Sequence, residues 1–172
     1  MASKSTPTTV SNKKINPLVG IIMGSKSDLP IMSAAQDFLN TMGIASEIAV
    51  VSAHRTPDLA IEYAKTARAR GLRVIITGAG GSAHLSGVIA SSTTLPVIGV
   101  PIKSSNSMDG WASVLSTLQM PNGVPVATVA LDSAHNAGIL AAQIIGTSDN
   151  DVAKKLDKFK QEMRDKIINA NK

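Results

Sequence analysis

LVGIIMGSKSD, residues Leu18 to Asp28, joins a short apolar run to a turn of small polar residues. The run from Leu18 to Met23 predicts a buried strand, and Gly24 predicts the turn that ends it. A helix is expected to begin near Pro30 with Asp28 as its cap, because proline fits the first helical turn and aspartate can accept hydrogen bonds from free N–H groups. The segment therefore predicts a strand, a polar loop and a helix.

The same unit repeats along the rest of the chain. Gly43 is expected to end the first helix, and Thr56-Pro57-Asp58 to open a second one that reaches Gly71. Further strands are expected at 45–51, 74–77, 97–100 and 126–130, with helices up to about residue 91, at 111–118 and at 136–145. Five short buried strands that alternate with helices predict an α/β fold, with three α/β/α layers and a mainly parallel, doubly wound sheet of the flavodoxin or Rossmann type.

Three regions are expected within the 172 residues. Residues 1–17 are rich in Ser, Thr, Asn and Lys and predict a flexible tail, whereas 18–148 predict one catalytic domain. A hydrophobic content of 44% is enough for its core. Residues 149–172 predict an amphipathic helix that packs either on this domain or on a neighbouring subunit. Its apolar stripe consists of Val152, Leu156, Phe159, Met163 and Ile167.

Composition argues against several classes of function. The chain has no cysteine, and its three histidines are not at ligand spacing, so we expect neither a disulfide nor a metal site. The net charge of +5 arises mainly in the tail and the last helix, and with 2% aromatic residues it does not indicate nucleic-acid binding. No apolar run reaches the roughly 20 residues that span a bilayer. We therefore expect a cytoplasmic protein whose partner is a small anionic molecule.

Three polar loops follow predicted strands, and the carboxyl ends of parallel strands meet at one edge of a sheet. In the first loop Gly24 allows close approach of a backbone, Ser25 and Ser27 offer hydroxyls, and Asp28 offers a carboxylate. These groups suit a phosphate and ribose hydroxyls. A simple helix cap is the other interpretation, and the loop has neither a Walker A ending nor a dinucleotide fingerprint.

The second loop, Ser52 to Pro57, carries the residues best suited to chemistry. Arg55 can bind phosphate oxygens through two N–H groups, and Ser52 can add a hydroxyl. His54 is the candidate for proton transfer, because an unperturbed histidine side chain titrates near neutral pH. A histidine that only braces the turn is the alternative.

The third loop has glycine at positions 78, 80 and 81 and is followed by His84. Gly80 and Gly81 predict a cleft floored by backbone, against which a planar ring fits. The glycines can equally serve the close packing of a helix on a strand. His84 is expected either to contact a carboxylate or to be structural.

Taken in order, the three loops resemble those of the N5-carboxyaminoimidazole ribonucleotide mutase family of purine biosynthesis. The resemblance is carried by Met23 to Asp28, Ser52 to Pro57 and Gly78 to Leu85. The segments 96–101, 119–126 and 136–142 are similar to later segments of the family, so that the likeness covers residues 18–148.

The resemblance implies an isomerase with no cofactor and no metal, which moves a carboxylate from an exocyclic amine to C4 of an imidazole ring through trapped CO2. It implies His54 as the catalytic acid and base, with His84 facing the carboxylate region. It also implies a homo-octamer with sites shared between subunits. The substrate-binding residues that match the family are Ser25, Asp28, Ser52, Arg55, Gly24, Gly80 and Gly81.

The chain departs from the usual family pattern at three places. Ser86 stands where the family has proline, Leu29 where it often has an aromatic residue, and residues 104–109 differ. Without the ring of a proline, Ser86 could loosen the helix start beside His84. Two other functions stay open: a carboxylase of the same fold that uses free CO2, which tends to carry lysine at the position of Arg55, and a non-catalytic protein that binds a phosphorylated nucleotide.

Overall fold

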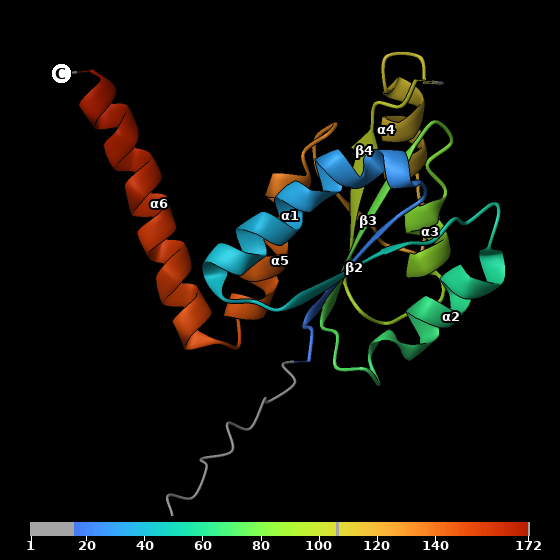
Figure 1. Cartoon of the computed structure of the whole chain (residues 1–172), viewed down its shortest axis with the longest axis horizontal. Helices are drawn as coiled ribbons and strands as arrows, with labels where there is room; N and C mark the ends of the chain where they lie inside the picture. Colours follow the sequence, from blue (N-terminus) through green and yellow to red (C-terminus); the bar gives the residue numbers. More distant parts are fainter. Residues whose placement is uncertain (1–15, 106, 172) are drawn as a thin grey trace, which may run out of the picture.

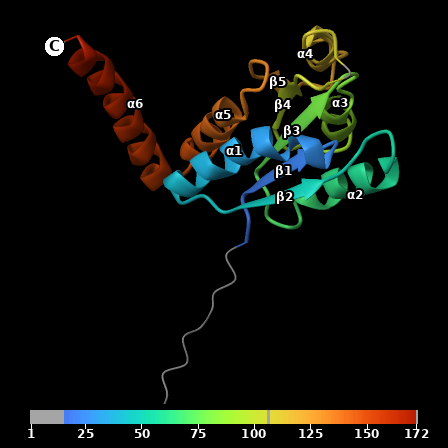
Figure 2. The same ribbon diagram turned by 45° about the horizontal axis from the view of Figure 1, so that its top comes forward.

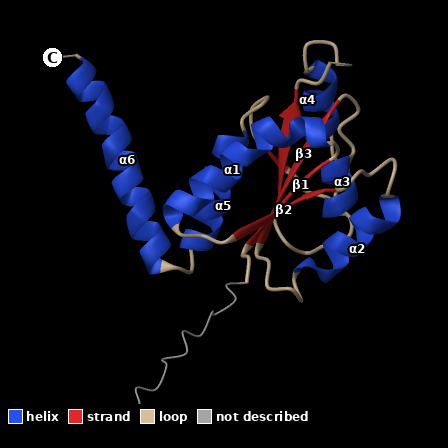
Figure 3. Cartoon of the chain, in the orientation of Figure 1, coloured by secondary structure: helices blue, strands red, loops and turns tan. Residues whose placement is uncertain are grey.

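The computed structural model describes residues 16–105 and 107–171, and helices lie on both faces of its sheet (Figure 1, Figure 3). The strand order is β2-β1-β3-β4-β5 and every neighbouring pair is parallel. This is the flavodoxin-like doubly wound order, which confirms the expected fold class. The elements are β1 (Val19–Met23), η1 (Lys26–Asp28), α1 (Leu29–Met42), β2 (Ser46–Val50), α2 (Pro57–Ala67), β3 (Val74–Gly80), α3 (Leu85–Ala90), β4 (Val97–Ile102), α4 (Trp111–Leu118), β5 (Ala127–Thr128), α5 (Ala134–Gly146) and α6 (Asn150–Ala170).

The central strands of the sheet are buried, but its edge strands are not. All five residues of β1 are buried because helices cover both faces, which explains why its sequence is a continuous apolar run rather than an alternating one. β2 is only partly buried, and β5 is a partly exposed pair of residues. The expectation of five buried strands is therefore wrong at the edges, where a strand has a neighbour on one side only.

Two pairs of helices form two cores on opposite faces of the sheet. α1 and α5 pack on one face around residues such as Met32 and Ile76, and α2 and α3 cover the other face around Ile75 and Ile89. α5 lies very close to α1, since a side chain at Gly138 would meet the backbone oxygen of Ala35 at 2.9 Å. These two layers hold the strand ends in fixed positions.

The start of α1 differs from the expectation for its cap. Asp28 is the N-cap residue of α1, as expected, but its side chain does not make the expected capping hydrogen bond. Ser25 instead caps the short turn η1, since its Oγ accepts a hydrogen bond from the Ser27 N–H at 3.3 Å. The Asp28 carboxylate is thereby left for another role.

The ends of α1 and α2 can be compared with the expectation that Gly43 and Gly71 end these helices. Gly43 follows α1 with φ of 72°, a left-handed conformation that glycine adopts without strain, as expected. α2 ends at Ala67, earlier than expected, and a turn leads from there to Gly71, whose φ is 96°.

The last helix, α6, packs on its own domain along its first half. Val152 is buried, and the Phe159 ring meets the Phe38 ring edge to face with centroids 5.1 Å apart. Met163 and Ile167 are 43% and 68% exposed, and this end of the helix stands away from the sheet (Figure 1, Figure 2). The apolar stripe is thus only half covered.

Two findings concern the remaining regions of the chain. Of the expected tail 1–17, only Asn16 and Pro17 lie within the described residues. Among residues 16–105 and 107–171, no helix combines the length and the apolar character needed to cross a membrane.

Candidate active site

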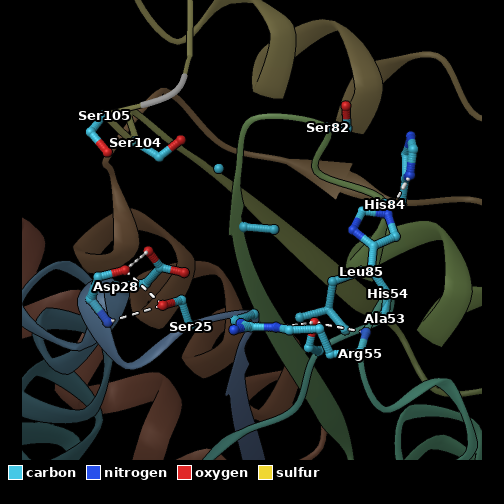
Figure 4. A pocket seen from close by; sticks show the side chains of 15 residues that line it. Ser25, Asp28, Ala53, His54, Arg55, Ser82, His84, Leu85, Ser104 and Ser105 are labelled. Carbon is cyan, nitrogen blue, oxygen red and sulfur yellow. Dashed lines mark hydrogen bonds between the residues drawn. The ribbon is translucent and has the colours of Figure 1, made fainter.

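A pocket of about 620 Å³ lies at the carboxyl edge of the sheet, where the three expected loops meet (Figure 4). Segments that follow β1, β2, β3 and β4 line it, as is typical of an open parallel sheet in which the winding direction reverses. Most of the residues predicted from the sequence are brought together here. Those that line the pocket are Gly24, Ser25, Asp28, Ser52, His54, Arg55, Gly80 and His84.

One end of the pocket offers hydroxyl groups from the loop after β1. Ser25 Oγ accepts a hydrogen bond from the Ser27 N–H at 3.3 Å and lies 2.8 Å from Ser27 Oγ. Ser27 Oγ also lies 3.2 Å from Asp28 Oδ1 and donates its single hydrogen to that carboxylate. An anion at this end therefore meets two linked hydroxyl groups that the turn η1 holds in place.

Asp28 is a buried carboxyl group beside these hydroxyls. Its side chain is 5% exposed, and burial raises its pKa above the usual aspartate range. Three weaker effects oppose the rise: the side-chain hydrogen bond with Ser27, the backbone hydrogen bond at Ser25, and the positive charge of Arg55. Since a raised pKa means that the folded state disfavours the carboxylate, Asp28 is held in the pocket at a cost in stability.

Arg55 joins the first two loops. Its Nη2 donates to the Gly24 carbonyl oxygen at 2.7 Å, and its Nε donates to Ser52 Oγ at 3.3 Å. Ser52 Oγ also accepts from the Arg55 backbone N–H at 3.3 Å, which fixes the turn. A guanidinium has five N–H groups, so these two side-chain bonds orient it and leave donors for a phosphate.

The other end of the pocket holds a pair of histidines that sequence reasoning did not connect. His54 Nε2 lies 2.8 Å from His84 Nδ1, and the two rings are perpendicular with centroids 5.0 Å apart (Figure 4). Both side chains are exposed in the single chain. A hydrogen bond of this length holds one proton between two nitrogens, so the two rings must take complementary tautomers.

The glycine segment is partly strand rather than loop. β3 continues through Gly80, and a side chain at Gly78 would collide with Met32 of α1, so Gly78 serves close helix packing. Gly80 lines the pocket, whereas Gly81 is buried outside the lining and turns the chain with φ of 61°. The expected loop of 78–81 is therefore wrong, because its first three residues belong to the sheet.

The structure adds lining residues that were not predicted. Ser104 and Ser105 follow β4 and lie near Asp28 and Ser25, and Ser82 lies near the histidines (Figure 4). The signal that identified the other loops applies to these serines too, because they directly follow a buried strand. Their loop was treated as a departure from a family rather than as a fourth strand end.

Ser86 does not loosen the helix beside His84. Its side chain is buried, and its Oγ lies 2.7 Å from Thr77 Oγ1 in β3. The expectation for this residue is wrong, because the hydroxyl that replaces a proline ring makes a bond to the sheet.

The fold and the pocket define a doubly wound α/β enzyme with an anion-binding end and a paired-histidine end. Among the described residues, no group of three His, Cys, Asp or Glu side chains gathers to hold a metal ion. The groups that line the pocket are suited to acid–base chemistry and to hydrogen bonding.

Comparison with known proteins gives the family. A family model described as AIR carboxylase matches residues 18–166, and the chain belongs to this family. It is 54% identical over 158 residues to the N5-carboxyaminoimidazole ribonucleotide mutase of Pyrococcus horikoshii (92% of this chain, 89% of the relative). It is 56% identical over 152 residues to the enzyme of the same name from Thermotoga maritima (88% of each). The crystal structure of Treponema denticola PurE matches with a TM-score of 0.80 and 34% identity, over 89% of this chain and 95% of that one.

The buried carboxyl of Asp28 leads to a prediction for stability. Asp28→Asn is expected to raise the melting temperature at neutral pH, because the substitution removes a desolvated carboxylate and keeps an oxygen for the Ser27 hydroxyl. A gain of about 1 kcal/mol corresponds to roughly 2–4 °C for a chain of this size. Since the pKa of Asp28 is raised, the difference between variant and wild type is expected to shrink as the pH falls through it.

Thermal unfolding at neutral and at mildly acidic pH measures this effect. Asp58→Asn is the control, because it removes an exposed carboxylate from the first turn of α2 and brings no such gain. A melting temperature of Asp28→Asn below that of the wild type at neutral pH would contradict the prediction.

Proposed function

We propose that this chain is an N5-carboxyaminoimidazole ribonucleotide mutase in which His54 is the general acid and base. The observation that carries the proposal is the bonded pair of His54 and His84 in one pocket with Ser25 and Arg55. The names of the Pyrococcus and Thermotoga relatives support the reaction. Since the reaction is an isomerisation, it consumes nothing besides its substrate.

The proposed reaction needs one proton to be moved within the site. When the bond between the exocyclic nitrogen and the carboxylate carbon breaks, CO2 leaves, the electron pair stays on nitrogen, and nitrogen takes up a proton. C4 of the ring then forms a bond to the trapped CO2 and releases its proton. One proton is taken and one is released, so a single histidine that first donates and then accepts balances the cycle.

The histidine pair suits this cycle. His54 lies in the loop after β2, at the end of the pocket opposite the donors around Arg55, so a substrate whose phosphate is held by Arg55 extends its ring toward His54. His84 is the hydrogen-bond partner of His54, and it fixes which nitrogen of the His54 ring carries the proton. We assign the exchange with C4 to His54 and the contact with the carboxylate to His84.

The polar end of the pocket is assigned to the phosphate and the ribose. Ser25, Ser52 and Arg55 present donors to phosphate oxygens, and the Asp28 carboxylate accepts hydrogen bonds from ribose hydroxyls. Gly24 gives its carbonyl oxygen to Arg55 and Gly80 gives a side-chain-free wall for the imidazole ring. We assign Gly81 a supporting role, as the turn between β3 and His84.

The carboxylase is the second candidate, because the matching family is described as AIR carboxylase. Both reactions place CO2 beside C4 of the ring, and they differ in whether the CO2 comes from the substrate or from solution. Arg55, which occupies a position where the carboxylase branch tends to carry lysine, favours the mutase. The bonded histidine pair in the pocket favours an enzyme over a purely binding protein.

We also propose that the chain forms a homo-oligomer, with the octamer as its expected size. Three large apolar side chains on α4 are exposed, as is the distal half of the α6 stripe. Exposed apolar patches of this kind mark contact surfaces between proteins. The residues are Trp111, Leu115 and Leu118 on α4 with Met163 and Ile167 on α6.

His54→Asn tests the catalytic assignment. Turnover is expected to fall at least about a hundredfold, as for loss of a general acid and base, while substrate affinity stays within roughly tenfold. His135→Asn is the matched control, because this third histidine packs against Phe38 away from the pocket. Steady-state kinetics and calorimetric titration provide the two readouts, and unchanged turnover of His54→Asn would rule out the role.

The source of CO2 separates the mutase from the carboxylase. In bicarbonate-free buffer, the N5-carboxylated nucleotide is expected to give the C4-carboxylated product, because CO2 recombines with C4 before it leaves the pocket. Product is followed by its absorbance and by chromatography. Conversion only of the uncarboxylated nucleotide with added CO2 would favour the carboxylase instead.

Substitution on the exposed half of α6 tests the oligomer. Met163→Glu with Ile167→Glu is expected to reduce the mass of the particle in light scattering, since each places a charge in the proposed contact. Gln161→Glu is the control, because it adds a charge on the opposite side of the helix. Equal masses for wild type and double variant would contradict the α6 contact.

A further inference from the structure

Ser86 belongs to a buried chain of hydroxyl groups that joins α3 to the sheet. Its side chain is 1% exposed and that of Thr77 in β3 is 0% exposed, and the two oxygens lie 2.7 Å apart. Thr77 Oγ1 also donates to the Ile98 carbonyl oxygen of β4 at 3.1 Å. Three elements, α3, β3 and β4, are therefore linked by two consecutive hydrogen bonds.

The direction of these bonds follows from the count of hydrogens. The Ile98 carbonyl can only accept, so the single hydroxyl hydrogen of Thr77 points to it. Ser86 must then donate its own hydrogen to Thr77 Oγ1. Each hydroxyl in the chain has its donor used, which is the condition under which a buried polar pair stabilises one arrangement.

The hydrogen bond between Ser86 and Thr77, called the tie below, lies next to His84 in the sequence. Ser86 is the second residue of α3, and His84 is the residue immediately before this helix. On the other side of His84, the Ala83 N–H donates to Ser116 Oγ of α4 at 3.0 Å. The backbone of His84 is thus held between two hydroxyl groups that belong to different elements.

Packing of its own ring does not fix His84, because its side chain is exposed. The position of the ring follows from its backbone and from the 2.8 Å bond to His54. A displacement of α3 by about 1 Å lengthens such a bond beyond hydrogen-bond range. The tie between Ser86 and Thr77 is the feature that resists this displacement from the side of the sheet.

We propose that Ser86 is a positioning residue, whose bond to Thr77 holds His84 in hydrogen-bond contact with His54. This inference deepens the proposed function and rests on it for its effect on turnover. The proline that the family has at this position restricts α3 through its ring, whereas Ser86 restricts it through a bond to β3. Phosphate binding is not affected, because Ser25 and Arg55 lie on other loops.

Three variants separate the hydroxyl from other properties of the site. Ser86→Ala removes the tie and leaves the bond from Thr77 to Ile98 intact. Thr77→Ser keeps the hydroxyl and removes only a methyl group. Ser91→Ala removes the hydroxyl of the serine that follows α3, which bonds to the Val88 carbonyl oxygen at the far end of the helix.

The first readout needs no substrate. With ¹⁵N-labelled histidine, the chain gives signals from three imidazoles, and the tautomers of His54 and His84 are read from their nitrogen shifts. Ser86→Ala is expected to change the His54 and His84 signals and to leave those of His135 in place. Thr77→Ser and Ser91→Ala are expected to keep all of them.

The second readout is kinetic. Ser86→Ala is expected to lower kcat on the order of tenfold to a hundredfold with KM within about twofold, because misplacement of a catalytic group affects the chemical step rather than phosphate binding. Unchanged kcat, unchanged imidazole signals, or an equal loss in Thr77→Ser would each overturn the proposal. A lower melting temperature of Ser86→Ala without a change in kcat or in the imidazole signals would also contradict the proposal, because it would indicate a purely structural role. If the wild type fails to convert the N5-carboxylated nucleotide, the proposed function fails, and the imidazole signals still decide whether Ser86 holds the pair.

Discussion

Parallel pairing of β1 with β3 is the constraint on which the site depends. β1 has β2 on its other side, so the chain winds first in one direction and then in the other, and the loops diverge to leave a crevice. The pairing continues past the strand ends: the Gly24 N–H donates to the Gly78 carbonyl oxygen at 3.0 Å, and the Val51 N–H donates to the Met23 carbonyl oxygen at 2.8 Å. These bonds place the first loop beside the other two and bring the Gly24 carbonyl within reach of Arg55.

The crevice holds two kinds of groups at its two ends. Donors gather at one end around Ser25 and Arg55, while the two histidines occupy the other end. Asp28 lies among the donors as a buried carboxyl whose pKa is raised by burial, although the Ser27 hydroxyl, the Ser25 backbone and the Arg55 guanidinium favour its charged form. A side chain that lowers the stability of the folded state is typical of a functional site. At such a site the residue is kept for binding rather than for folding.

Sequence patterns predicted the strands and the loops of the site because both depend on local properties. Apolar runs followed by glycine and polar residues located the strand ends, and the parallel sheet brought them together. The contact between His54 and His84 joins residues 30 positions apart and depends on side-chain directions, which no local pattern encodes. The extension of β3 through Gly80 could not be predicted for a different reason. Glycine suits a turn and a closely packed strand equally well, so its presence does not show where the strand ends. The bond between Ser86 and Thr77 cannot be predicted from the local sequence, because the partner of the Ser86 hydroxyl lies nine residues away in the sheet.

Exposure of the histidines links the chemistry to assembly. Loss of CO2 from a carboxylate is favoured when the carboxylate leaves water, yet His54 and His84 are exposed in the single chain. The loop that adds Ser104 and Ser105 to the pocket leads directly into α4, whose Trp111 is 66% exposed. A second chain that covers this apolar surface therefore comes to lie beside the mouth of the pocket. We propose that a neighbouring subunit in this oligomer covers the mouth of the pocket, so that the contact that buries apolar surface also excludes water from the site.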